Sequence, residues 1–251
     1  MTIQSLFKYG RFNQYTEAVI STPTIWLSPP AELNDPFEVR PWFTFNGSQD
    51  AIVGLFARSL RKQNPELTPD EVSAYAARHF NEGRHLDPNI WEVLRQDMVA
   101  KLGQNIGLYC LSEHNDSILM WTHYAAEHSG YCLEFEVADN FNAAQQVKYA
   151  TKFPVVDVFT TPLKEQVDLV FLTKFQGWSY EREWRIVDIK RGSGPREYPR
   201  ELLRSVIFGL KMQETEREKI RVWVKKRGHS VRFFQEQQDN QQFKIVIKEI
   251  S

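Results

Sequence analysis

The sequence predicts an α+β fold: a mixed, mainly antiparallel β-sheet body with peripheral helices and an inserted helical segment. The expected strands are short and irregularly spaced, and no regular helices separate them, which argues against a doubly wound parallel sheet. Helical patterns instead concentrate at about residues 50–103, where they interrupt the strand-forming segments.

Length and composition are those of an ordinary globular protein. The chain has 251 residues, of which 42% are hydrophobic and 25% charged, and we expect a single domain over residues 1–251. The net charge of −1 shows no overall basic surface of the kind that nucleic-acid binding uses. No apolar run approaches the ~18 residues that span a membrane, and residues 1–9 lack signal-peptide features. We therefore expect a cytoplasmic protein without a membrane partner.

The N-terminal part is predicted to form two strands with a short helix between them, followed by a turn. Residues 6–9 and 24–28 are apolar, aromatic and β-branched, which predicts strands. A short helix is expected between them, and Asn34-Asp35-Pro36 predicts a turn after the second strand. In the insertion, Thr68-Pro69-Asp70-Glu71 has the pattern of a capping box, and Asp87-Pro88 starts a further helix.

The second half alternates strands and helices. Ser117 can cap a helix that Gly130 ends. Residues 131–137 alternate with period two, which predicts a half-buried strand. Cys110 and Cys132 lie in apolar stretches, and we expect both to be buried free thiols. The other expected elements are a strand at 107–112, a strand at 155–159, a helix at 161–175 that includes Lys174, a strand at 184–189, a loop at 191–199 and a β-α-β-β tail at about 203–249.

Three short segments carry residue types suited to chemistry. The first contains Asn34, Asp35 and Glu38 in a loop after a strand, where sites often lie; the alternative is an Asx turn that bonds its own backbone. The second is a short helix with Trp121, His123, Tyr124 and His128.

His123 and Glu127, four residues apart on the second segment, share a helical face and can pair. The alternative for this segment is that Trp121 and Tyr124 are core residues and that His128 caps the helix C-terminus.

The third segment contains Trp178, Glu181 and Glu183. Two residues apart on an extended strand, both carboxylates point to one face, and paired carboxylates suit general-base chemistry or the stabilisation of a positive charge. The alternative is a surface strip of ion pairs with Arg182 and Arg185. We assign no metal ligands, because the two cysteines, Cys110 and Cys132, show no zinc-type spacing.

These segments, in this order, resemble a bacterial and phage-borne family catalogued as domain of unknown function 2971. The resemblance covers residues 6 to about 209 and implies no activity; relatives of this type are suspected in anti-phage defence. It rests on residues 6–9, 26–29, 34–38, 109–112, 120–125, 128–130 and 178–185.

A more distant similarity is to the ADP-ribosyltransferase layout, in which three strands surround NAD. It implies a first-strand position at Lys8 or Tyr9, a middle position at Ser28 and a last position at Glu183, with Glu181 accessory. The first strand departs from that layout, since neither Arg nor His stands there.

The leading functional hypothesis is an enzyme that acts on a nucleotide or nucleic acid, with NAD as a substrate and Glu183 and Glu181 as catalytic residues. Its expected substrate-binding residues are Tyr9, Ser28, Asn34, Asp35, Trp121, His123, Tyr124 and Trp178. One alternative is a metal-dependent nuclease that uses Asp35, Glu38, Glu181 or Glu183. The other is a non-enzymatic module that binds a phage or partner protein through an exposed apolar patch on the inserted helices.

Overall fold

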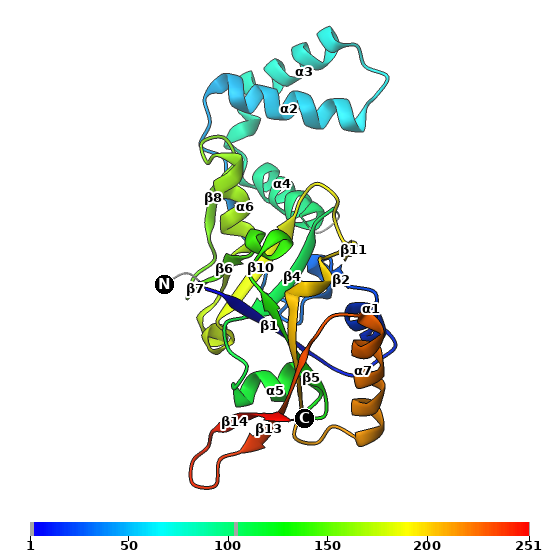
Figure 1. The fold of residues 1–251 in the computed structure, drawn as a ribbon. Helices are drawn as coiled ribbons and strands as arrows, with labels where there is room; N and C mark the ends of the chain where they lie inside the picture. Colours follow the sequence, from blue (N-terminus) through cyan, green and yellow to red (C-terminus); the bar gives the residue numbers. More distant parts are fainter. Residues whose placement is uncertain (1–2, 103–104, 251) are drawn as a thin grey trace. The chain divides into compact units, whose positions relative to one another are not determined.

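The computed structural model describes residues 3–102 and 105–250 and has the predicted α+β fold (Figure 1). Residues 1–2, 103–104 and 251, which include the expected end of the insertion and of the domain, lie outside this description. The chain divides into two compact units. Unit 1 comprises 1–36, 105–151 and 174–251, and unit 2 comprises 37–104 and 152–173. That they act as one domain stays a prediction.

Unit 1 contains a mixed, mostly antiparallel sheet of eight strands among the described residues. From edge to edge its order is β14 (Ile245–Ile250), β13 (Arg232–Gln238), β12 (Leu203–Phe208), β5 (Tyr131–Glu136), β1 (Ser5–Gly10), β4 (Gly107–Ser112), β10 (Glu183–Asp188) and β6 (Gln145–Gln146). Only β12 and β13, which α7 (Glu214–Arg227) connects, are parallel within this described sheet.

Both faces of the central strands are covered. On one face, α1 (Thr16–Ser21) lies beside α7, and Ile20 and Ile220 join the larger core cluster (Figure 1). On the other face, Trp121 of α5 (Ile118–Tyr124) packs in a cluster with Cys132. The prediction that Cys132 is a buried thiol is therefore confirmed, because α5 covers this face of β5, whereas Cys110 is only half-buried.

Two predicted elements of unit 1 differ in the structure. The expected loop at 191–199 contains β11 (Gly194–Glu197), which pairs with β2 (Thr24–Leu27); its Gly-Pro start masks the strand pattern. The expected helix at 161–175 is shorter, since α6 (Leu163–Phe171) ends before Lys174, which lies in β9 (Thr173–Phe175). β9 pairs with β7 (Lys148–Ala150), and this tertiary pairing outweighs the local helical pattern.

Helix α5 begins as predicted, with the Ser117 hydroxyl accepting from the Met120 N–H at 3.4 Å, but it ends before Gly130. Ala126, Glu127 and His128 all have positive φ, so Glu127 shares no helical face with His123 and the expected pairing was wrong. Gly130 serves a close approach instead, because a Cβ there would lie 2.2 Å from the Gly10 carbonyl oxygen.

Unit 2 carries the predicted helices and a small parallel ribbon. The capping box at Thr68 and Glu71 and the Asp87 cap are confirmed. Ile52, Phe56 and Ala76 form its core cluster. Its elements are β3 (Trp42–Thr44) paired with β8 (Val155–Asp157), α2 (Gln49–Gln63), α3 (Pro69–Asn81), α4 (Pro88–Lys101) and α6.

Short 3₁₀ helices complete the described chain: η1 (Pro30–Glu32), η2 (Arg84–Leu86), η3 (Asp139–Ala143), η4 (Gln176–Glu181) and η5 (Arg200–Leu202). No helix in the described ranges combines the length and the apolar character that a membrane crossing requires.

Candidate functional site

A cavity of about 410 Å³ opens on unit 1, beside β1, β4 and β10. It brings together side chains that lie up to 178 positions apart, from Phe7 to Arg185. Most of the expected site residues line it, namely Tyr9, Ser28, Asn34, His123, Tyr124, Glu181 and Glu183. The two expected catalytic carboxylates and a middle-strand serine therefore share one hollow.

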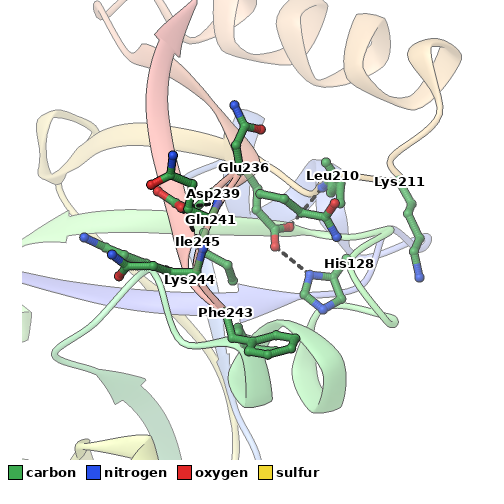
Figure 2. Close-up of a pocket in the computed structure, with 13 residues that line it drawn as sticks. His128, Leu210, Lys211, Glu236, Asp239, Gln241, Phe243, Lys244 and Ile245 are labelled. Atoms are coloured by element: carbon green, nitrogen blue, oxygen red, sulfur yellow. Dashed lines mark hydrogen bonds and ion pairs between the residues drawn. The ribbon is translucent and has the colours of Figure 1, made fainter.

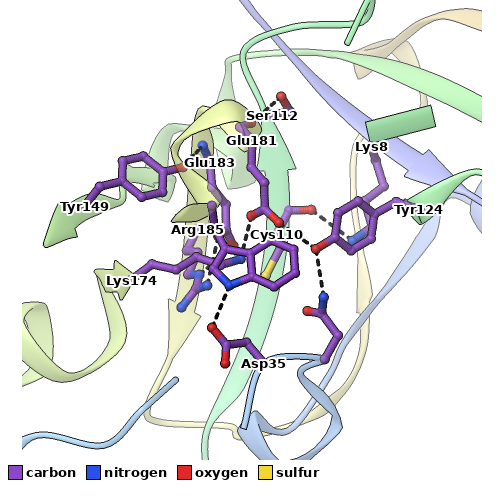
Figure 3. A network of polar contacts seen from close by, with 12 residues as sticks. Lys8, Asp35, Cys110, Ser112, Tyr124, Tyr149, Lys174, Glu181, Glu183 and Arg185 are labelled. Carbon is purple, nitrogen blue, oxygen red and sulfur yellow. Dashed lines mark hydrogen bonds and ion pairs between the residues drawn. The ribbon is translucent and has the colours of Figure 1, made fainter. Parts of the chain in front are cut away.

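Four buried charged side chains form the floor of the cavity (Figure 3). The Lys174 ammonium lies between two carboxylates, 2.5 Å from Glu181 Oε2 and 3.1 Å from Glu183 Oε2. Arg185 donates to both oxygens of Glu183, from Nε to Oε1 at 2.6 Å and from Nη2 to Oε2 at 2.9 Å. All four side chains are at most 5% exposed, which rules out the surface ion-pair strip.

The carboxylates of Glu181 and Glu183 point to the same side because the backbone between them is kinked, and not because of strand alternation. Glu181 ends η4, Arg182 adopts a left-handed conformation with φ 46° and ψ 51°, and Glu183 begins β10. Two bonds fix this kink: the Ser112 hydroxyl donates to the Glu181 carbonyl at 2.6 Å, and the Glu113 N–H donates to the Arg182 carbonyl at 3.1 Å. The expectation of an extended backbone at Glu181 was wrong, although both carboxylates do meet Lys174.

Tyr124 connects α5 to the carboxylates. Its hydroxyl donates to Glu181 Oε1 at 2.6 Å and accepts from Asn34 Nδ2 at 3.0 Å. Three of the expected site residues, from three distant segments, thus form one continuous chain of hydrogen bonds. Burial is the main cause that raises the pKa of Tyr124, and the neighbouring Glu181 carboxylate adds to it, so this hydroxyl keeps its proton.

The two carboxylates differ in their protonation chemistry. Burial raises the pKa of Glu181, and the negative charge of Glu183 adds to this, against the opposing effects of Lys174 and Tyr124. Burial would also raise the pKa of Glu183, but Arg185 and Lys174 outweigh it and lower that pKa to about 2. Glu181 is therefore the carboxylate that can exchange a proton, whereas Glu183 stays ionised as an anchor for the two cations.

Asp35 and Trp178 lie beside the cavity but outside its lining. Trp178 Nε1 donates to Asp35 Oδ2 at 2.7 Å, and the Lys174 ammonium lies 5.2 Å from the centre of a Trp178 ring. His123, which lines the cavity, packs at 6.4 Å from Trp178. The indole thus supports the buried lysine from one side.

Two expected residues have side chains that bond elsewhere, and a third is paired through its backbone. Trp121 is fully buried in the core, where its Nε1 donates to the Asn115 carbonyl at 2.8 Å, and it does not line the cavity. The Tyr9 hydroxyl donates to the His114 carbonyl at 2.9 Å. The Ser28 backbone bridges to Leu108. Glu38 belongs to unit 2.

The sequence analysis did not predict the two cations of the site, Lys174 and Arg185. Lys174 was expected in a helix, and Arg185 was considered only in the alternative of a surface strip of ion pairs. One signal was available for Arg185: it stands two residues after Glu183 on β10, so both side chains fall on one face of that strand. Further lining residues that the reasoning did not place in the site are Arg11, Trp26, Glu32, Cys110 and Ser112.

No metal centre is evident in the part of the chain that the structure describes. There, no group of three or more His, Cys, Asp and Glu side chains could hold a metal ion. In addition, Lys174 takes the position between Glu181 and Glu183 that a divalent cation would need.

A family model described as "Protein of unknown function (DUF2971)" matches residues 120–186. This range runs from α5 to β10 and includes Tyr124 and all four buried charged side chains, Lys174, Glu181, Glu183 and Arg185. The match supports the resemblance to that family within this range and lends no support to the ADP-ribosyltransferase similarity. Nothing among curated proteins or solved structures matches the chain.

Proposed function

We propose that this protein is an enzyme that binds a nucleotide in the cavity of unit 1 and cleaves its N-glycosidic bond, with NAD as the substrate to test first. The observation that carries the proposal is Glu181: a buried carboxylate with a raised pKa that faces the cavity and is oriented by Tyr124 and Lys174. Perturbed carboxylates in clefts are typical of catalytic acids and bases.

The surroundings of Glu181 suit a nucleotide. Lys8 and Arg11 add positive charge to the lining and can pair with phosphate oxygens. Trp26 also lines the cavity and is 58% exposed, so its ring is available for a base to stack on. The Asn34 carboxamide, whose Nδ2 donates to Tyr124, also lines the cavity.

In the proposed reaction, the bond between ribose C1′ and the nicotinamide nitrogen breaks, and its electron pair leaves with nicotinamide. The ribose ring then carries an oxocarbenium-like positive charge, which the Glu181 carboxylate stabilises. A water oxygen bonds to C1′, and the proton of that water passes to Glu181. The role of Glu183 becomes that of a positioning residue, since it holds Lys174 and Arg185 in place.

The test is nicotinamide release from NAD, together with NAD binding measured by calorimetry. We expect Glu181→Gln to lower turnover by roughly 10²–10⁴-fold. Because the ionised form of Glu181 is required and its pKa is raised, turnover should fall as the pH drops through that raised value. Glu136→Gln, a change of the same type at a partly exposed position on β5, should behave as wild type. Absence of both NAD binding and nicotinamide release in the wild type, or full activity of Glu181→Gln, would refute the proposal.

The alternatives are less well supported. A metal-dependent nuclease needs carboxylates that converge on a metal ion, whereas Glu181 and Glu183 converge on an ammonium group. A protein that only binds a partner protein needs no polar cavity. Exposed apolar side chains such as Tyr75 and Leu86 lie on the inserted helices, and they do not account for the polar cavity of unit 1.

A further inference from the structure

His128 lies outside the proposed active site, at a second cavity of unit 1, of about 470 Å³, which the β13–β14 hairpin also lines. Figure 2 shows its imidazole directed at Glu236 of β13. The distance from Nδ1 to Oε1 is 2.5 Å. The Glu236 side chain is 2% exposed, and its second oxygen accepts from the Leu210 N–H at 2.9 Å. A buried carboxylate is therefore fixed between a histidine and a backbone amide.

The other imidazole nitrogen faces α5. His128 Nε2 lies 3.2 Å from the Thr122 hydroxyl oxygen, and that hydroxyl donates its single hydrogen to the Ile118 carbonyl at 2.8 Å. The imidazole thus joins two segments through hydrogen bonds at both of its nitrogens, Nδ1 to Glu236 of β13 and Nε2 to Thr122 of α5.

The backbone at His128 indicates that this arrangement is strongly specified. Ala126, Glu127 and His128 have φ values of 48°, 52° and 72°, a left-handed conformation that is sterically unfavourable for residues other than glycine. Such strain persists only where surrounding contacts over-determine the conformation, and it concentrates at functional sites. The backbone contacts here are the His128 N–H to the Trp121 carbonyl and the Lys211 N–H to the His128 carbonyl.

The contact between Thr122 and His128 connects the second cavity with the proposed active site. Thr122 is two residues before Tyr124 on a helix of seven residues, and Tyr124 donates to Glu181. We propose that His128 is a positioning residue: tied to β13 through Glu236, it holds α5 through Thr122 and so keeps the Tyr124 hydroxyl on Glu181. The catalytic consequence rests on the proposed function, whereas the positioning of Tyr124 can be measured without any turnover.

The test compares Thr122→Val, which loses the hydroxyl's bonds to His128 and to the Ile118 carbonyl at nearly unchanged size, with Thr122→Ser, which keeps both. In the full chain, Thr122→Val should speed backbone hydrogen exchange in α5 by about tenfold, as loss of one partner of a part-buried hydrogen bond implies. It should also shift the ¹³Cζ resonance of Tyr124, and Thr122→Ser should restore both readouts. Thr24→Val, on β2 and outside both cavity linings, is the control for the substitution type.

Three results would overturn the inference. They are unchanged α5 exchange in Thr122→Val, equal effects of the Val and Ser variants, and faster exchange with an unshifted Tyr124 resonance. If wild-type protein releases no nicotinamide from NAD while the exchange and resonance effects appear, the proposed function fails and the positioning role of His128 stands.

Discussion

At the scale of single residues, Glu183 shows how the fold stabilises a buried charge. Its carboxylate accepts from Arg185 at 2.6 and 2.9 Å and from Lys174 at 3.1 Å. Removing one partner from such a group leaves the opposite charge buried without compensation, which is costlier than loss of the pair itself. We expect Glu183→Gln to lower the free energy of unfolding by roughly 3–5 kcal/mol, measured by urea denaturation at pH 7.

The same carboxylate predicts acid sensitivity. Its pKa is lowered from 4.5 in the unfolded chain to about 2 in the folded one, so its stabilisation is present above pH 4.5 and is lost as the pH falls toward 2. In Glu183→Gln this part of the pH dependence should disappear. Glu136→Gln, whose partner Arg204 is partly exposed, should cost less than about 1 kcal/mol. Equal costs for the two variants would contradict the assignment of Glu183 as a buried anchor.

At the scale of elements, the junction between η4 and β10 depends on the backbone of Arg182. Because φ is 46° there, a β-branched residue is strongly disfavoured while glycine is not. We expect Arg182→Val to destabilise the protein by roughly 1–3 kcal/mol and to lower nicotinamide release, since the kink aims both carboxylates at Lys174. Arg182→Gly is the matched control and should unfold close to the wild-type midpoint. Equal unfolding midpoints for the two variants would show that the kink is not under this constraint.

The local signals in the sequence were enough for most elements. The Thr68 capping box and the Asp87 and Ser117 caps are short-range chemistry, and each one marks the start of a helix in the structure. The apolar stretch around Cys132 predicted its burial correctly, although alternation alone cannot reveal that α5 covers this face of the strand. Lys174 was misjudged because β9 exists only through its pairing with β7, which lies 23 or more residues earlier in the chain.

For the candidate site, the sequence indicated the acids and rings but not their partners. Asn34, Tyr124 and Glu181 were expected to lie together, and they form one hydrogen-bonded chain. The division of roles between Glu181 and Glu183 could not be foreseen, because it depends on which carboxylate Arg185 binds. The burial of a site and the charges around it are set by the folded chain, so the spacing of residues in the sequence predicts neither of them.

At the scale of the whole molecule, the chain passes between the two units four times, after residues 36, 104, 151 and 173. If unit 2 unfolded alone, unit 1 would have to hold the ends of two open loops, and closing loops costs entropy. We therefore expect one cooperative thermal transition, with equal calorimetric and van't Hoff enthalpies. Two separate transitions would contradict the prediction of a single domain.

The central place of β1 has a consequence for synthesis. β1 pairs along its whole length with β5, and at Phe7 with Ser112 of β4. A ribosome that adds 5–20 residues per second makes β4 and β5 roughly 5–25 s after β1. During that interval Leu6 and Tyr9, which end up buried, are exposed on the growing chain. Early protection of this segment by a chaperone should therefore govern the yield of folded protein in cells.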